Sequence, residues 1–397
     1  MKDTFKILHL ITGLGTGGAE VMLGRLVSAM DRDRFENEVV YMADAGPIAA
    51  DLAAGGIAVS GLGMRAGTSG PAALVRLAAT LRRFRPRVLQ TWMYHANLMG
   101  SLLPRFRGPR LIWGLHHSNF SVRANKLRTL AVIRACAPLS YCAPTRIVCC
   151  SESVRDAHRA IGYNSRKLVV IPNGYDTGRF QPDPDSGSAL RAELGVPADA
   201  PVVSLMARFH PQKNHASFIE AASIVHQHRP DAHFVLCGSG VVWENPSLAG
   251  PIAARGLDGC FHLLGPVGDP RRILAGSTVL ASSSVGEGMS NVIAEAMACG
   301  TVCVVTDVGE SANVVGDTGF VVPPQDHEAL ARMLLSAIGL SQDTRRSIGA
   351  AARRRIDSHF NLSQTVHLYQ TLYEAVAKDS NRPCPDRHRT HHELPTT

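Results

Sequence analysis

The sequence predicts an α/β protein built from two doubly wound parallel sheets. Short apolar runs typical of buried strands alternate with segments in which apolar residues recur at helical spacing. Such alternation is typical of parallel strands joined by helices that cover both faces of a sheet. The chain has 397 residues, a length that exceeds one ordinary core and suits two.

The first half opens with a strand, a glycine-rich turn and a helix. The strand is Phe5–Ile11, the turn is Gly13–Gly18, and the helical spacing runs from Ala19 to Met30. Further strands are expected at 38–42, 88–90, 111–115, 146–150 and 167–171, with helices at 72–84, 97–103, 125–135 and 154–160. We therefore expect residues 1–172 to form an N-terminal Rossmann-like domain.

A loop separates this unit from a second one. Residues Gln181–Ser188 are rich in Pro, Asp, Gly and Ser, which predicts a loop close to a domain boundary. Strands are then expected at 202–206, 233–237, 261–264, 279–281, 302–306 and 319–322, with helices at 216–226, 271–275, 291–298 and 327–338. Residues 173–359 are expected to form the second Rossmann-like domain. A long helix is expected at about 360–378, and the polar stretch 379–397 is expected to be a disordered tail.

The charge is distributed unevenly between the two halves. Residues 1–172 carry 23 Lys or Arg against 10 Asp or Glu, whereas residues 173–397 carry 18 against 23. From Leu52 to Ser151 there is no acidic residue, while 13 Arg and one Lys fall in that span. This asymmetry indicates an anionic partner for the first half: a membrane surface, a phosphate-bearing molecule or a nucleic acid. The alternative is an Arg-rich surface that only contacts solvent.

Export and membrane signals are not evident in the sequence. No run approaches the ~20 apolar residues that a membrane-spanning helix needs. The N-terminus lacks a signal-peptide core with a small-residue cleavage site. The nine Cys show no disulfide-framework spacing. We therefore expect a cytoplasmic location, with peripheral attachment to the inner face of the plasma membrane as an option.

The segment from Gly286 to Gly300 carries the clearest chemistry. Glu287 stands in a loop beside Gly288, and Glu295 stands one turn into a helix that begins near Ser290. A glycine before a helix lets a ligand approach the backbone, and the free amides of a helix start suit a pyrophosphate. A carboxylate one turn further in can accept hydrogen bonds from ribose hydroxyls.

The same segment resembles a known family. Glu-Gly-Met-Ser-Asn followed by Glu-Ala-Met-Ala-x-Gly is similar to the E-x7-E signature of glycosyltransferase family 4, whose members are retaining enzymes with the GT-B fold. Other family segments occur in order, so that the resemblance covers most of residues 5–375; they are Ser151–Val154, Ile171–Asp176, Ser204–Asn214 and Leu236–Gly240. The resemblance implies two Rossmann-like domains that face a central cleft, with a C-terminal helix that crosses back to the N-terminal domain.

The resemblance also implies residue roles. Arg208 and Lys213 would bind the donor diphosphate, and Glu295 would hold the ribose. Glu287 would hold the donor sugar and is a candidate catalytic group. The backbone of the following loop and the first glycine turn would approach the donor as well; these residues are Gly17, Gly18, Gly288, Met289, Ser290 and Asn291.

Histidines stand at the ends of two strands in the first half. His95 follows one strand, and His116 and His117 follow the next, at the edge where a doubly wound sheet binds ligands. Family members have a functional histidine after the second strand, so His116 and His117 are both catalytic candidates. His95 and Asn97 are candidate acceptor contacts.

The implied reaction moves a sugar from a nucleoside diphosphate sugar to a saccharide or lipid-linked acceptor in the synthesis of cell-surface polysaccharide or glycolipid. A UDP-sugar is the first expectation for the donor, and a GDP-sugar is the second. The basic first half would contact anionic lipid headgroups, and no nucleic acid is expected. The two Asp-x-Asp triplets, at 31–33 and 183–185, are interpreted as ordinary loop residues and not as a metal–diphosphate site. No metal and no other cofactor is therefore expected.

Three alternatives stay open at this point. The spacing Gly13-x-Gly15-x-x-Gly18 between a strand and a helix, with Asp44 after the second strand, fits an NAD-dependent oxidoreductase. A GT-B nucleotide-sugar epimerase or phosphorylase would share the architecture. A non-catalytic, membrane-bound saccharide-binding protein would share the basic surface.

Overall fold

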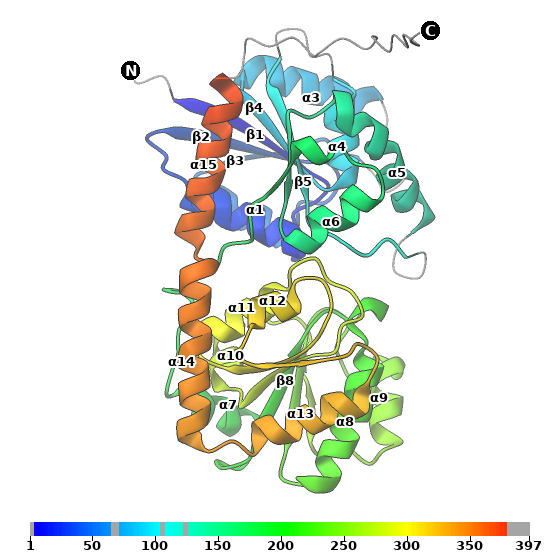
Figure 1. Cartoon of the computed structure of the whole chain (residues 1–397), viewed down its shortest axis with the longest axis vertical. Coiled ribbons are helices and arrows are strands. Elements are labelled where there is room, and N and C mark those ends of the chain that lie inside the picture. The colour runs from blue at the N-terminus through cyan, green and yellow to red at the C-terminus, as the bar shows by residue number, and fades with distance from the viewer. Residues whose placement is uncertain (1–3, 65–70, 104–107, 122–125, 379–397) are drawn as a thin grey trace, which may run out of the picture.

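The computed structural model describes residues 4–64, 71–103, 108–121 and 126–378. It shows two α/β domains stacked along the long axis of the molecule, each built on one parallel sheet with helices on both faces (Figure 1). The predicted fold class is confirmed. The predicted tail at 379–397 lies outside the described residues.

The N-terminal sheet has the order β3-β2-β1-β4-β5-β6-β7. Its strands are β1 (Phe5–Ile11), β2 (Phe35–Tyr41), β3 (Ala58–Gly61), β4 (Val88–Trp92), β5 (Arg110–Leu115), β6 (Arg146–Cys149) and β7 (Leu168–Val170). Its helices are α1 (Gly18–Ala29), α2 (Gly46–Ala54), α3 (Pro71–Phe84), α4 (Tyr94–Ser101), α5 (Leu127–Cys142), α6 (Glu152–Ala160) and the short 3-10 turn η1 (Ser165–Lys167). The strand order reverses direction between β1 and β4, which is the point where such sheets open a crevice for ligands.

The C-terminal sheet has the order β10-β9-β8-β11-β12-β13 and reverses between β8 and β11. Its strands are β8 (Val202–Met206), β9 (His233–Cys237), β10 (Phe261–Leu263), β11 (Val279–Ser282), β12 (Val302–Thr306) and β13 (Phe320–Val322). The helical segments around it are α7 (Ser186–Leu194), η2 (Pro211–Lys213), α8 (His215–His228), α9 (Pro246–Ala253), α10 (Arg271–Gly276), α11 (Asn291–Ala298), α12 (Ser311–Val315), α13 (His327–Ile338) and α14 (Gln342–His359).

The last helix, α15 (Leu362–Lys378), returns to the N-terminal domain, as predicted. Its buried residues Val366, Tyr369 and Tyr373 join the apolar core formed by α1, β1 and β4. Figure 1 shows α14 and α15 following one another along one side of both domains. The two crossings between the domains are tied together, because the Tyr175 amide donates to Phe360 O at 2.8 Å and the Leu362 amide donates to Tyr175 O at 3.0 Å.

Several elements differ from the prediction. Helix α7 begins at Ser186, inside the stretch predicted as loop, because the Asp183 carboxylate accepts from the Ser186 hydroxyl at 2.5 Å and folds the chain into a helix start. Helix α5 continues to Cys142, beyond its predicted end, and accommodates Pro138 in its interior. The elements α2, β3, α9, α12 and α14 were not predicted. None of the described helices is both long and apolar enough to cross a bilayer.

Candidate active site

The predicted site segments lie where the strand order of each sheet reverses. There they face each other across the domain boundary. In the N-terminal sheet they follow β1, β4 and β5, and in the C-terminal sheet they follow β8 and β11. Because parallel strands end at the same edge, these loops gather at one place in each domain. A Cβ added to Gly18 at the start of α1 would lie 3.7 Å from Asn291 Nδ2 at the start of α11. The two helix starts therefore meet.

Glu287 and Lys213 form an ion pair within the C-terminal domain. The Ser284 hydroxyl also donates to Glu287 Oε1 at 2.7 Å, and the glutamate is only 8% exposed. The loops that carry the pair are joined, since the Val285 amide donates to Gln212 O at 2.8 Å and the Ser283 hydroxyl donates to Lys213 O at 2.9 Å. Two residues predicted as separate ligands are thus one charged unit, in which the glutamate is buried and the lysine is partly exposed.

Arg208 is exposed and forms no ion pair with any described residue. Its charge acts on Glu20 in the first turn of α1. Burial raises the pKa of Glu20, while the backbone amide of Glu20 and the Arg208 charge oppose this rise. The guanidinium of Arg208 therefore stands near the glycine turn at Gly17 and Gly18, on the other side of the domain boundary.

The loop that holds Glu287 is docked on the N-terminal domain. The Ser118 hydroxyl donates to Glu287 O at 2.5 Å. A Cβ on Gly288 would lie 2.5 Å from His116 O, a distance that no real Cβ adopts. Gly309 has φ +57°, and a Cβ there would lie 2.2 Å from Glu287 O. Glycine is required at both positions because backbone from another segment occupies the space of a side chain.

Helix α11 begins directly after this loop. Ser290 is its N-cap residue and makes no side-chain capping bond, so the amides of the first turn remain available to an anion. Asn291 Oδ1 accepts from Asn173 Nδ2 at 3.2 Å and from the Tyr175 hydroxyl at 3.1 Å, which fixes the helix start against the interdomain connection. Met289 is buried and packs in the core below.

The two adjacent histidines occupy different environments. The His116 ring stacks on Trp92, with ring centres 5.2 Å apart, and both its ring nitrogens are buried without a hydrogen-bond partner among the described residues. Burial lowers the pKa of His116 to about 4, so the imidazole is neutral at neutral pH. The His117 ring contacts Phe120. His117 also contributes to the lowered pKa of His210, after the larger effects of burial and two nearby cations, and this places His117 toward the C-terminal domain.

Glu295 lies at the contact between the domains, 7% exposed, in an ion pair with Arg25 of α1. The Arg25 guanidinium also lies over the rings of Tyr175 and Phe180, at 5.4 Å and 5.7 Å from their centres. Burial raises the pKa of Glu295, and Arg25 opposes this rise. Arg25 Nη1 is buried and has no partner among the described residues.

The two acceptor candidates differ in availability. Asn97 is fully buried; its Oδ1 accepts from the Thr91 hydroxyl at 2.7 Å and its Nδ2 donates to Gly114 O at 3.4 Å. Both ends of this amide are therefore committed to the sheet, and its role here is structural. His95 is half-buried at the start of α4, and burial lowers its pKa.

Sequence reasoning missed several residues at this boundary. Arg25 stands seven residues after Gly18, so both lie on one face of α1, a spacing that could have pointed to it. Ser118 had no comparable signal, because its contact with Glu287 joins residues 169 positions apart. Within the described part of the chain, no cluster of three or more His, Cys, Asp or Glu side chains suits a metal ion.

Two family models match the chain over most of its length. Residues 16–179 match the model described as Glycosyltransferase Family 4, and residues 200–339 match the model described as Glycosyl transferases group 1.

Curated relatives and solved structures agree with these models. The chain is 25% identical to the UDP-Gal:alpha-D-GlcNAc-diphosphoundecaprenol alpha-1,3-galactosyltransferase of Escherichia coli, over 76% of this chain and 78% of that protein. It is 33% identical to the alpha-maltose-1-phosphate synthase of Mycolicibacterium smegmatis, over 52% of this chain and 57% of that protein, so it matches little more than half of that relative. The structure of Anabaena Alr3699/HepE in complex with UDP-glucose superposes with a TM-score of 0.82 at 24% identity, covering 93% of this chain and 99% of that one. This likeness shows the fold.

Proposed function

Because the chain belongs to glycosyltransferase family 4, we propose that it transfers a sugar, with retention of configuration, from a UDP-sugar to a saccharide or lipid-linked acceptor. One observation supports the proposal most directly. The Glu287–Lys213 unit, the start of α11 and the Gly17–Gly18 turn meet at the domain boundary, where the strand order of each sheet reverses. The E. coli and Anabaena relatives, named for UDP-Gal and solved with UDP-glucose, favour uracil as the base.

The donor would lie on the C-terminal domain. Arg208 and Lys213 are the cations that would contact the diphosphate, and the free amides at the start of α11 would share its charge. These groups stabilise the nucleoside diphosphate most strongly as its negative charge develops, which is where such contacts accelerate a reaction. Lys213 would remain beside Glu287, so that the carboxylate is held in position to accept hydrogen bonds from the donor sugar.

Transfer would proceed on one face of the donor sugar. An acceptor hydroxyl attacks the anomeric carbon as the bond from that carbon to the β-phosphate oxygen breaks. The hydroxyl proton passes to the departing phosphate, which leaves as UDP. The backbone carbonyl of His116 lies beside Gly288 in the contact between the domains, while its neutral imidazole stacks on Trp92.

No metal ion is part of this proposal. Arg208, Lys213 and the helix start would supply the positive potential that a divalent cation supplies in other transferases. The alternatives of an oxidoreductase or an epimerase are not favoured, since both family models describe glycosyltransferases.

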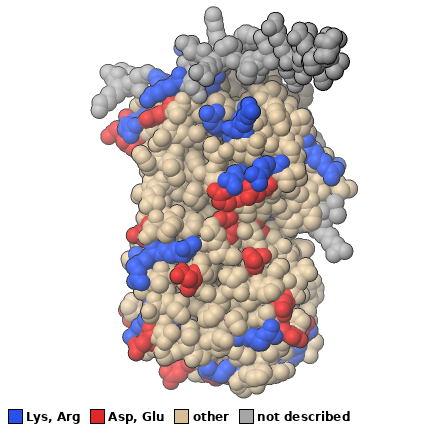
Figure 2. All heavy atoms as spheres, in the orientation of Figure 1, with Lys and Arg blue, Asp and Glu red and all other residues tan. Residues whose placement is uncertain are grey.

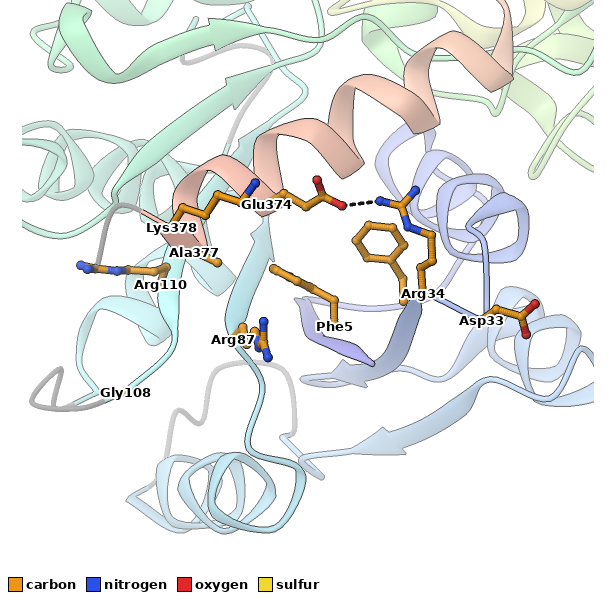
Figure 3. A pocket seen from close by; sticks show the side chains of 10 residues that line it. Phe5, Asp33, Arg34, Arg87, Gly108, Arg110, Glu374, Ala377 and Lys378 are labelled. Carbon is orange, nitrogen blue, oxygen red and sulfur yellow. Dashed lines mark hydrogen bonds and ion pairs between the residues drawn. The ribbon is translucent and has the colours of Figure 1, made fainter. Parts of the chain in front are cut away.

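We propose further that the N-terminal domain contacts an anionic membrane surface. On the face shown in Figure 2 its basic side chains form separate groups rather than one continuous patch. At the opposite edge of the sheet from the active site, a pocket of about 800 Å³ brings Arg34, Arg87, Arg110 and Lys378 together around Phe5 (Figure 3). Arg34 is paired with Glu374 there. Arg105, Arg107 and Arg123 lie outside the described residues.

Vesicle binding tests the membrane contact. Binding to vesicles that contain anionic phospholipid, and not to neutral ones, is expected at low salt and should weaken as the salt concentration rises. Equal binding to both kinds of vesicle, or none, would remove this part of the proposal.

Nucleotide binding tests the main proposal. UDP, GDP, ADP and NAD are titrated by calorimetry into the wild type, Arg208→Ala and the control Arg332→Ala, which changes an exposed arginine on α13. We expect one nucleoside diphosphate to bind selectively and the Arg208 variant to weaken it roughly 10-fold or more, as a lost charge-assisted hydrogen bond predicts. Binding of NAD alone, equal in all three proteins, would exclude the transferase site.

A further inference from the structure

A second cavity adjoins the active site and has a different chemical character. It has a volume of about 640 Å³ and lies between the loop after β5, the start of α8 and the start of α13. Both domains contribute side chains to it, which are Asn119, Gln212, Asn214, Ser217, Gln325 and His327. We call it the amide pocket after its four Asn and Gln side chains.

The amide pocket shares a wall with the Glu287–Lys213 unit. Gln212 and Val285 line the pocket and are hydrogen-bonded to each other, while the ion pair begins one and two residues further along the same two loops. The Gln212 side chain also donates to Gly286 O. A molecule in the pocket would therefore lie next to a donor sugar held by Glu287.

The charge and hydrogen-bonding capacity of the lining residues indicate the class of ligand that the pocket suits. Among the residues that the structure describes, no Asp, Glu, Lys or Arg lines the pocket, although 41 basic and 33 acidic side chains occur in the chain and the adjoining site is charged. Amide and hydroxyl side chains both donate and accept hydrogen bonds, as sugar hydroxyls do. A phosphate would require cationic donors to replace its hydration, and these are lacking among the described lining residues. The volume lies within the range of ordinary ligand pockets.

We propose that the amide pocket is an acceptor subsite that takes an uncharged sugar unit. This inference rests on the proposed function and specifies it: the hydroxyl that receives the donor sugar belongs to a neutral saccharide end. Any phosphate or lipid part of the acceptor extends out of this pocket.

Two variants probe the pocket without threatening the fold. Gln325 has φ +65°, a conformation that glycine adopts without strain, so Gln325→Gly removes the amide and keeps the backbone. Ser217 lies in the first turn of α8, where a carboxylate is favourable, so Ser217→Glu fills the pocket with a charge and preserves the helix. Ser336→Glu, on the exposed side of α13, is the matched control.

The experiment measures saturation-transfer NMR on the UDP-loaded protein. The probes are the methyl α-glycosides of glucose, galactose, mannose and N-acetylglucosamine, and the competitors are inorganic phosphate and glucose 1-phosphate. We expect at least one neutral glycoside to bind, to resist inorganic phosphate, and to bind about fivefold more weakly in Gln325→Gly and Ser217→Glu but not in Ser336→Glu.

Each other result overturns the inference. Displacement of the glycoside by inorganic phosphate would make the pocket a phosphate site. Equal binding in all variants would place the sugar elsewhere. Absence of glycoside binding to a protein that binds UDP would exclude the subsite and leave the proposed function intact. Failure to bind any nucleotide would exclude the proposed function itself.

Discussion

Replacing Arg25 with Met is expected to destabilise the protein through the carboxylate that it leaves behind. The side chains of Arg25 and Glu295 are 14% and 10% exposed, so the pair is buried between the domains. Removing one partner of such a pair costs about 3–5 kcal/mol, because a charge remains without compensation. Met keeps the apolar contact with Tyr175 and Phe180, which isolates the electrostatic part of the loss.

The loss should depend on pH. Burial raises the pKa of Glu295 and Arg25 opposes that rise, so the pKa in the folded variant lies higher than in the wild type. A carboxyl whose folded pKa is raised binds its proton more tightly in the folded state, so the penalty is full above the folded pKa and disappears as the pH falls toward the unfolded value. The variant should therefore approach the wild type in stability as the pH falls toward the ordinary pKa of a glutamate.

Urea unfolding followed by tryptophan fluorescence at pH 5, 6, 7 and 8 measures this. Glu295→Gln in the Arg25→Met background supplies the control, since the double variant should lose the pH dependence and recover about 2 kcal/mol or more. An Arg25→Met penalty that is under about 1 kcal/mol, or that stays constant with pH, would refute the reasoning that the buried carboxylate causes the loss.

Three further outcomes are expected. Gly288→Ala should lower kcat/KM by ~100-fold, because its Cβ would meet His116 O and displace the loop, whereas Gly250→Ala, which has nothing within 4 Å, should leave the rate unchanged in a UDP-release assay. The imidazole of His116 should titrate near pH 4 in a proton NMR titration, and titration near 6.5 would contradict its burial. The folded state should also lose stability as the pH falls from 6.5 toward 4, because in this range His116 takes up a proton in the unfolded state but not in the folded state. EDTA should leave more than about half of the transfer rate, and a rate restored only by added Mg²⁺ or Mn²⁺ would show that Arg208 and Lys213 do not suffice.

The sheet architecture could be predicted because each buried strand is a short apolar run. Strands β1, β8, β9 and β12 match their predicted ranges at both ends, and the start of α11 was predicted at its observed place. Helix α14 escaped prediction because it is largely polar, with few buried residues, so that apolar periodicity is weak. Helix α7 escaped because Pro, Asp and Ser favour both a turn and a helix start.

The members of the site could be predicted more readily than their partners. The motif around Glu287 indicates a ligand, and Arg208–Lys213 indicates cations, but the pairing of Glu287 with Lys213 joins residues 74 positions apart. Asn97 illustrates the opposite failure, since its place after a strand suggested a ligand contact while the side chain bonds inward to the sheet. Contacts of this kind depend on three-dimensional packing rather than on a local pattern.

The return of α15 to the first domain affects how the protein is made. The core around β1 and β4 includes Val366, Tyr369 and Tyr373, so the first domain lacks part of its interior until α15 has left the ribosome. The second domain, whose sheet and covering helices end at α14, can complete its own core before then. The order of synthesis and the order of completion are therefore reversed. Residues 1–172 expressed alone would leave an apolar face uncovered, and would need Leu362–Lys378 added as a peptide to fold fully.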